Sequence, residues 1–351
     1  MPMQKKKENS VQRRAKRRCP VLSFFSGCGA FDLGFASAGF SIELALDVDE
    51  LAVKTYNHNK RTEVCHVADL SELDGHSIIQ MYKKKGTGVL PRGVIGGSPC
   101  QTFSKGNVHF RGNDARHMLP RHYARILRVL NLKYNLDFFV FENVKGIKSN
   151  RHRKEYGTIK RLFSRAGFKL FEGELDAADF GVAQHRRRVF IVGFNKTKYP
   201  DLEFRFPEAI TTPPLTVGSK LKGLPEPLFF RRGVRHSDIR HHPNHWTMYP
   251  RSPKFTNGSL TTNYKRGRSF HVLDWDKPSR TVAYGNREVH IHPNTHRRLS
   301  VYEAMLLQGF PDDYEILGTL SDQIRQVSDA IPPQIGEVLG KAIYAALYSA
   351  D

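Results

Sequence analysis

The 351-residue sequence predicts an α/β fold, with a mixed, mostly parallel sheet of seven strands and a second, smaller domain of irregular structure. Three observations support this prediction. Through residue 194, short apolar runs alternate with segments of helical periodicity, which is typical of strands joined by helices. Glycine-rich or polar residues follow several of these runs directly, where open α/β sheets bind ligands. After residue 194, short basic and proline-rich segments without a strong period replace this alternation.

The expected strands are short apolar runs, and they cover residues 19–25, 41–49, 64–67, 93–97, 137–141, 168–175 and 189–194. We expect helices after the first two strands and over residues 121–133. A closing helix over residues 335–348 should pack back against the first domain. Residues 102–120 are polar and glycine-rich, so we expect them to form a mobile loop able to close over a substrate.

The composition indicates a globular protein in a reducing, cytoplasmic compartment. Hydrophobic residues make up 39% of the chain, with no apolar run of membrane-spanning length and no secretion signal. The cysteines form no Cys-x-x-Cys pair and no zinc spacing, so we expect neither disulfides nor a metal site. They are Cys19, Cys28, Cys65 and Cys100.

The charge balance predicts a polyanionic partner. The chain has 55 Lys or Arg against 34 Asp or Glu, a net charge of +21. Eight of the basic residues lie within residues 1–18, which we expect to be a separate basic arm. That arm either grips phosphate or is a solvated tail.

The first two strands end in residues suited to a nucleotide-like ligand. The turn from Ser26 to Gly34 is rich in glycine, and such a turn cradles ligands at a helix N-terminus, although many similar turns bind nothing. Its spacing is not GxGxxG and no P-loop lysine follows, so neither NAD nor ATP is indicated. Asp47 ends the second strand, where a carboxylate can accept hydrogen bonds from ribose hydroxyls. The alternative for Asp47 is an ordinary helix N-cap.

The fourth and fifth strands deliver a cysteine and a glutamate to the same edge of the expected sheet. Cys100 follows the run Gly96-Gly97-Ser98-Pro99, and the alternative for it is a buried structural cysteine. Glu142 and Asn143 come directly after the fifth strand, where desolvation should raise the pKa of the glutamate. In strand geometry Gln184, Arg186 and Arg188 share one face, and arginines so placed pair with carboxylates or bind an acceptor-rich ligand.

Six blocks in this order resemble the motifs of the DNA (cytosine-5) methyltransferase family, of the bacterial or phage restriction-modification type. The blocks are FSGCGAFDLGF, GGSPCQTFS, FENV, QHRRRV, SRTV and RRLSVYEAMLLQGFPDDY. The resemblance runs from Cys19 to the C-terminus. It implies a Rossmann-like S-adenosylmethionine-dependent methyltransferase domain over residues 19–194 and a target-recognition domain over 195–320. Residues 321–351 would form a C-terminal helix that returns to the catalytic domain.

The resemblance also implies the catalytic chemistry. The Cys100 thiolate would add to C6 of a cytosine flipped out of duplex DNA, which makes C5 nucleophilic. Glu142 would bind N3 and the N4 amine, and Arg188 would hold O2 as charge accumulates there. The other residues implied at the catalytic site are Pro99, Asn143, Arg186 and Gln184, of which Asn143 shapes the Pro99-Cys100 turn and Arg186 the backbone nearby.

S-adenosylmethionine is the cofactor that the resemblance implies. Asp47 would take its ribose, Val48 would pack on the adenine, and Asp69 would accept from the adenine amine. Cys28 is expected to pack near the loop. Asp329 stands where the family usually has an asparagine that contacts the methionine end of the cofactor, and we expect binding to be retained. The implied site comprises Phe25, Ser26, Gly27, Gly29, Leu33, Asp47, Val48, Asp69, Leu70 and Asp329.

Double-stranded DNA is the expected partner, bound by a chain that acts as a monomer without an obligate protein partner. Residues 195–280 carry 16 Lys or Arg against 7 Asp or Glu, although a solvated basic surface would show the same excess. A histidine run in this region fits no standard zinc spacing. The candidate DNA contacts are Gln101, Ser104, Lys105, Thr281, Arg231, Arg232, Arg266 and Arg268.

Three alternatives stay open from the sequence. A tRNA cytosine-5 methyltransferase of the same family would carry a Cys-Phe-Thr tripeptide, which this chain lacks. A catalytically inactive DNA-binding regulator would have lost the Pro-Cys or Glu-Asn-Val block, and both are present. A Rossmann-type oxidoreductase would show GxGxxG.

Overall fold

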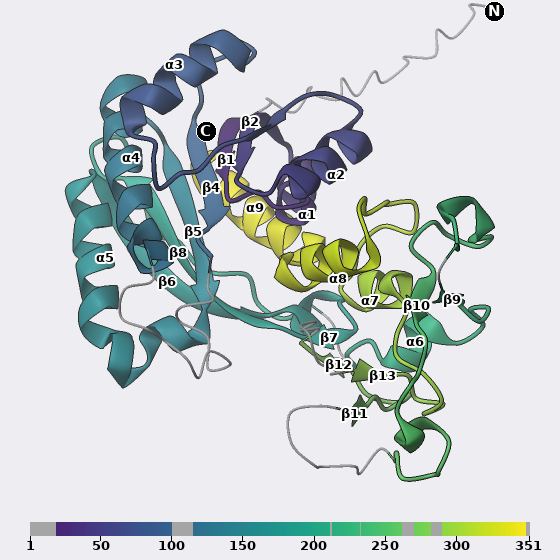
Figure 1. Cartoon of the computed structure of the whole chain (residues 1–351). Helices are drawn as coiled ribbons and strands as arrows, with labels where there is room; N and C mark the ends of the chain where they lie inside the picture. The colour runs from purple at the N-terminus through teal and green to yellow at the C-terminus, as the bar shows by residue number, and fades with distance from the viewer. Residues whose placement is uncertain are drawn as a thin grey trace, which may run out of the picture.

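A seven-stranded sheet forms the centre of the computed structural model, which describes residues 19–99, 115–210, 213–231, 233–261, 270–281 and 290–348 (Figure 1). The strand order is β3-β2-β1-β4-β5-β8-β6; the first five strands are parallel, and β8 is antiparallel to β5 and β6. The predicted mixed, mostly parallel sheet is confirmed. Its strands are β1 (Cys19–Phe24), β2 (Phe40–Asp47), β3 (Cys65–Val67), β4 (Gly93–Gly97), β5 (Phe138–Val144), β6 (Phe168–Asp176) and β8 (Arg187–Asn195).

Helices cover both faces of this sheet, which explains why its central strands are apolar throughout. All six residues of β1 are buried. One core contains Phe35 and Leu339, and the core on the other face contains Leu127 and Phe163. The first face is covered by α1 (Ala30–Ser37), α2 (Glu50–Lys60) and α9 (Pro333–Tyr348), and the second by α3 (Gly75–Lys85), α4 (Leu119–Tyr134) and α5 (Arg153–Arg165).

The closing helix α9 packs against α1, as expected from the sequence. The two helices approach so closely that a Cβ atom at Gly34 would lie 1.9 Å from the Pro333 carbonyl oxygen. Only glycine fits there, so the last helix is fixed against the helix that follows the glycine-rich turn. Before it, α8 (Leu320–Asp329) brings the C-terminal segment to the carboxyl edge of the sheet.

Short elements form a smaller lobe beside α8 (Figure 1). A hydrophobic cluster joins Trp246, Met305 and Tyr314 to Cys28 and Ala30 of the glycine-rich turn, so the segment around α7 is anchored on the large lobe. The helices of this part are α6 (Val217–Leu221) and α7 (Val301–Leu307). Its strands are β7 (Gln184–His185), β9 (Leu228–Phe230), β10 (Trp246–Met248), β11 (His271–Val272), β12 (Ser279–Arg280) and β13 (His290–Ile291).

The expected loop 102–120 is partly regular. A 3-10 turn occupies Ala115–Met118, and α4 begins at Leu119, where Pro120 in the first turn fits a helix start. The earlier part of that loop lies outside the described residues. No helix in the described segments is long and apolar enough to cross a membrane.

Candidate active site

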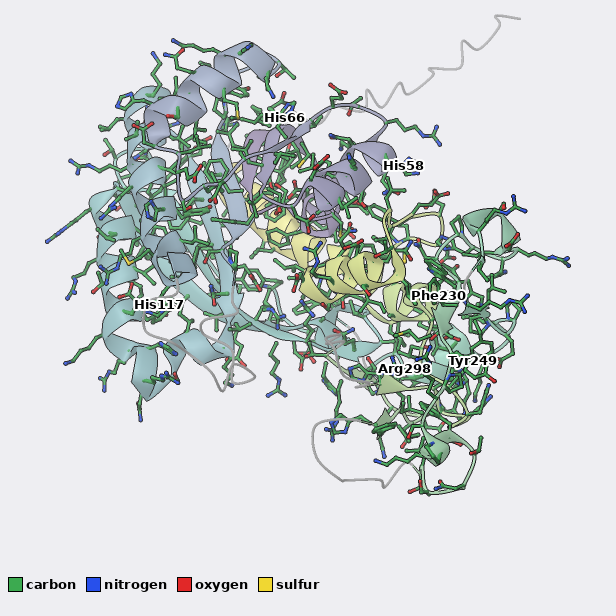
Figure 2. The ribbon with its side chains drawn as sticks, viewed as in Figure 1. His58, His66, His117, Phe230, Tyr249 and Arg298 are labelled. Carbon is green, nitrogen blue, oxygen red and sulfur yellow. The ribbon has the colours of Figure 1, made fainter. Side chains whose placement is uncertain are left out.

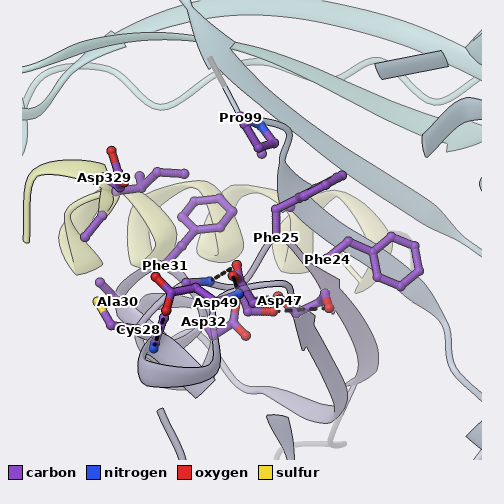
Figure 3. A pocket seen from close by; sticks show the side chains of 18 of the residues that line it. Phe24, Phe25, Cys28, Ala30, Phe31, Asp32, Asp47, Asp49, Pro99 and Asp329 are labelled. Atoms are coloured by element: carbon purple, nitrogen blue, oxygen red, sulfur yellow. Dashed lines mark hydrogen bonds between the residues drawn. The ribbon is translucent and has the colours of Figure 1, made fainter. Parts of the chain in front are cut away.

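A cavity of about 290 Å³ opens at the carboxyl edge of β1, β2, β4 and β5 (Figure 3). It brings together both groups of residues that the sequence singled out. From the expected cofactor site it is lined by Phe25, Ser26, Gly27, Asp47, Val48 and Asp329, and from the expected catalytic site by Pro99, Glu142 and Arg188.

Four expected cofactor residues do not line this cavity. Gly29 and Leu33 border a separate cavity of about 40 Å³. The Asp69 carboxylate accepts hydrogen bonds from the Ser71 amide, at 2.8 Å, and the Ser71 hydroxyl, at 2.7 Å. Leu70 is buried in the core below.

Asp47 holds the glycine-rich turn in place. One of its carboxylate oxygens accepts from the Gly27 amide at 2.7 Å and the other from the Asp49 amide at 2.9 Å. The N-cap of α2 is Asp49, so the alternative of Asp47 as that cap is wrong. Phe25 has a positive φ of 55°, a strained conformation typical of functional sites. Burial raises the pKa of Asp47.

A buried carboxylate beneath the turn, Asp32, was missed from the sequence. It accepts hydrogen bonds from the Ser23 hydroxyl at 2.7 Å and the Tyr56 hydroxyl at 2.9 Å, and it lines the cavity. The Ser26 hydroxyl in turn donates to Ser23 at 2.9 Å. Asp32 therefore connects β1, α2 and the glycine-rich turn. Burial raises its pKa from 3.8 to about 6.

We expect Asp32→Asn to remove a pH dependence of stability. Between pH 3.8 and about 6 the folded protein keeps the Asp32 proton and the unfolded chain loses it. The free energy of unfolding of the wild type should therefore fall across this window, relative to the variant, by roughly 3 kcal/mol. Urea unfolding of both proteins from pH 4 to 7 measures the difference, because Asp47 and Glu142 titrate in both. A constant difference across the range would contradict this role of Asp32.

Glu142 and Arg188 form the ionic centre of the cavity. The antiparallel pairing of β5 with β8 brings them together, with Arg188 Nε 2.9 Å from Glu142 Oε1 and both side chains largely buried. Gly97 is the register partner of Glu142 on β4, and a Cβ atom there would lie 2.4 Å from Glu142 Oε2. Burial raises the pKa of Glu142 despite the opposing charges of Arg188 and Arg186. The glutamate is thus suited to holding a proton against a ligand.

Asn143 fixes the backbone that leads to Cys100. Its buried amide donates to the Ser98 carbonyl oxygen at 3.3 Å and to the Ser98 hydroxyl at 3.2 Å. These contacts fix Ser98, and the role of Asn143 in shaping the Pro99-Cys100 turn stays a prediction. Cys100 itself lies outside the described residues.

The expectation that Gln184, Arg186 and Arg188 share one face of a strand is wrong. Gln184 belongs to β7, which pairs with β12, and Arg186 lies in the break before β8. Gln184 donates to Gln308 Oε1 at 3.3 Å, in the segment after α7. Arg186 donates to the Ser328 carbonyl oxygen at 2.8 Å and so fixes the end of α8 beside the cavity. Only Arg188 of the three lines the cavity.

The expected DNA contacts are only partly described. The Thr281 hydroxyl donates to the His185 carbonyl oxygen at 2.8 Å, where β12 meets β7. Arg231 is exposed and directly follows Phe230. Phe230 is 47% exposed and Tyr249 is 63% exposed (Figure 2). The other expected DNA contacts lie outside the described residues: Gln101, Ser104, Lys105, Arg232, Arg266 and Arg268.

The histidine run has a packing role in the described segments. His242 stacks on Tyr302 with ring centroids 4.1 Å apart, and His245 bonds with the Ser300 hydroxyl at 3.0 Å.

Two further cavity residues were missed, Asp49 and Arg325, which form an ion pair between α2 and α8. No local sequence signal marks that pair, because the two residues are far apart in the chain.

The sheet and the cavity at its carboxyl edge define the class of Rossmann-like methyltransferases. The model of the C-5 cytosine-specific DNA methylase family matches residues 19–345, and the chain belongs to this family. It is a DNA (cytosine-5-)-methyltransferase.

Relatives match over nearly the whole chain. The Type II methyltransferase M.FnuDI of Fusobacterium nucleatum is 32% identical over 353 residues, which cover 93% of this chain and 94% of that protein. M.NgoPII of Neisseria gonorrhoeae is 29% identical, with 93% and 96% covered. An E. coli prophage protein, described as a DNA modification methyltransferase, has a TM-score of 0.76 at 24% identity, with 93% of this chain and 99% of that chain covered. The last likeness shows the fold alone.

Proposed function

We propose that this enzyme transfers the methyl group of S-adenosylmethionine to C5 of a cytosine flipped out of a specific duplex DNA sequence. The transfer proceeds through a covalent bond between the Cys100 sulfur and C6. The buried Glu142-Arg188 pair carries this proposal, because it places a proton-holding acid and a cation at one cavity. The membership of the family supports DNA as the substrate.

The lining of the cavity fits S-adenosylmethionine. Asp47 offers a carboxylate for the ribose hydroxyls, and Val48 is 61% exposed, which leaves an apolar surface for the adenine. Asp329 lies on the side of α8 (Figure 3) and would face the methionine end. When bound, the cofactor supplies an electrophilic methyl group.

The residues of the chain activate the cytosine. The Cys100 thiolate forms a bond to C6, and the ring electrons move toward C5, which becomes nucleophilic. Glu142 bonds N3 and the N4 amine as N3 gains electron density, and Arg188 donates to O2. Once C5 carries the methyl group, its proton passes to water and the electrons of that C–H bond re-form the double bond between C5 and C6. The bond from sulfur to C6 breaks at the same time, which restores the thiolate and the aromatic ring. The target atom is out of reach in a stacked duplex, so the base must enter the cavity.

DNA recognition is assigned to the smaller lobe, over residues 195–320, with residues 1–18 as a separate basic arm. The excess of basic residues over 195–280 and the exposed Arg231 support phosphate contact. The relatives are named as Type II methyltransferases, which supports a role in restriction and modification.

The proposal is tested with S-adenosylmethionine labelled in its methyl group and two rival acceptors, unmethylated genomic DNA and tRNA. We expect label in DNA as 5-methylcytosine, and sequencing of the product then gives the target site. Label only in tRNA would assign the protein to the RNA branch of the family. Cofactor binding without transfer to either acceptor would favour the alternative that the protein is a catalytically inactive DNA-binding regulator.

Asp329→Asn is expected to tighten cofactor binding by about tenfold. An aspartate can accept from the cofactor's ammonium group, but it cannot donate to its carboxylate unless protonated. An asparagine at the same position needs no proton and adds a donor. Calorimetric titration with S-adenosylmethionine measures the affinity, and Asp313→Asn, at an exposed position outside the cavity, is the control. Unchanged affinity would mean that residue 329 does not touch the cofactor.

A further inference from the structure

Helices α4 and α5 carry a strong excess of positive charge on the outer side of the large lobe. Residues 119–134 contain four Lys or Arg and no acid, and residues 145–165 contain eight with one acid, Glu155. The two helices pack side by side over one face of the sheet (Figure 1). In Figure 2, side chains tipped with nitrogen point outward from them. This surface lies outside the cavity and has no role in the chemistry described above.

The acidic groups nearby are already paired. Glu155 accepts from Arg121 Nε at 2.7 Å, which joins α5 to α4. On β6, Glu172 lies 2.6 Å from Lys160 and Glu174 lies 2.9 Å from Lys145. Seven exposed basic side chains have no acidic partner in the described part of the chain: Arg125, Arg128, Lys133, Arg153, Lys154, Arg161 and Arg165. We call these seven the outer basic surface.

The outer basic surface has the spacing of a linear charge array. Arg125 and Arg128 are three residues apart on α4, and Lys154, Arg161 and Arg165 follow at i, i+7 and i+11 on α5, so each set shares one helix face. The three α5 positions span about 16 Å, which matches several phosphates along a DNA strand. Like charges held together without counter-charges favour a polyanion over a protein partner.

This surface is continuous with the catalytic edge. The chain runs from Glu142 at the end of β5 through two 3-10 turns, Lys145–Lys148 and Asn150–His152, directly into α5. The N-terminal end of α5, with Arg153 and Lys154, is thus the end nearest the cavity.

We propose that the outer basic surface binds the sugar-phosphate backbone of duplex DNA beyond the target site. Naming DNA as the ligand rests on the proposed function. The surface contacts phosphates and no bases, so it contributes affinity and salt dependence but no sequence preference.

The test replaces Lys154, Arg161 and Arg165 together by glutamine, which keeps helix propensity and removes three charges. The matched control replaces three basic residues by glutamine: Lys54 on α2, Arg61 at the C-terminal end of α2, and Lys341 on α9. These helices cover the other face of the sheet. Both variants lose the same net charge. Binding of a fluorescently labelled, unmethylated duplex is measured by anisotropy over a series of salt concentrations, without cofactor.

We expect the α5 variant to reduce the slope of log K against log salt by about two to three, since each phosphate contact contributes about 0.9. The affinity of the α5 variant for the duplex at 0.1 M salt should fall at least about tenfold, while its rate of methyl transfer at saturating DNA stays unchanged. The control variant should bind the duplex as the wild type does. Equal slopes for the two variants would overturn the proposal. Binding is measured without cofactor, so the result does not depend on methyl transfer. If the wild type binds DNA but methylates nothing, the proposed function is refuted, and the comparison of salt slopes still tests the outer basic surface.

Discussion

Glu142→Gln is expected to lower kcat for methyl transfer by about 10²- to 10⁴-fold, which is the usual contribution of a positioned acid. The carboxyl group lies on β5 beside Gly97 and is held 2.9 Å from Arg188 Nε. Burial raises its pKa, so it can hold a proton where N3 of cytosine needs one. Glutamine keeps the shape and a hydrogen-bonding amide, but it cannot transfer a proton.

The measurement is single-turnover transfer of labelled methyl group to DNA, with cofactor affinity determined in parallel. Cofactor affinity should stay near the wild-type value, because Glu142 acts on the base. Glu203→Gln is the matched control, since Glu203 pairs with Lys169 on the surface and lies outside the cavity. A Glu142→Gln rate within tenfold of wild type would contradict the assigned role.

The sequence predicted the parts of this molecule that depend on local pattern. Strands such as β4 and β5 are apolar runs ended by glycine or an acid, so their positions and the residues at their carboxyl ends follow from periodicity and topology. Asp47 and Glu142 meet at one cavity for that reason, and Arg188 joins them from the amino end of the antiparallel strand β8. The order of the motif blocks added the chemistry.

The remaining site residues depend on contacts between distant segments. Asp32 becomes a buried acid only because Ser23 of β1 and Tyr56 of α2 enclose it. The single face expected for Gln184, Arg186 and Arg188 is not formed, because Gln184 pairs with β12 of the smaller lobe. Neither partner is adjacent in sequence, and periodicity carries no information about such pairings.

Cys100→Ala is expected to abolish methyl transfer, with a residual rate below about one part in 10⁴, because no other group can form the bond to C6. The described segment reaches Pro99, which lines the cavity, and Asn143 fixes Ser98 before it. The described cysteines cannot substitute. Cys19, Cys28 and Cys65 are all buried, and burial raises the pKa of the Cys28 thiol to about 12, so it stays protonated.

A duplex containing 5-fluorocytosine tests the covalent step directly. Fluorine at C5 cannot leave as a proton does, so after methyl transfer the bond from the Cys100 sulfur to C6 persists. Wild type should give a protein-DNA adduct that survives denaturation, Cys65→Ala should give the same adduct, and Cys100→Ala should give none. An adduct formed by Cys100→Ala would show that a residue other than Cys100 is the nucleophile. Methylation by wild type without any adduct would exclude the covalent route and leave Glu142 and Arg188 to activate the ring alone.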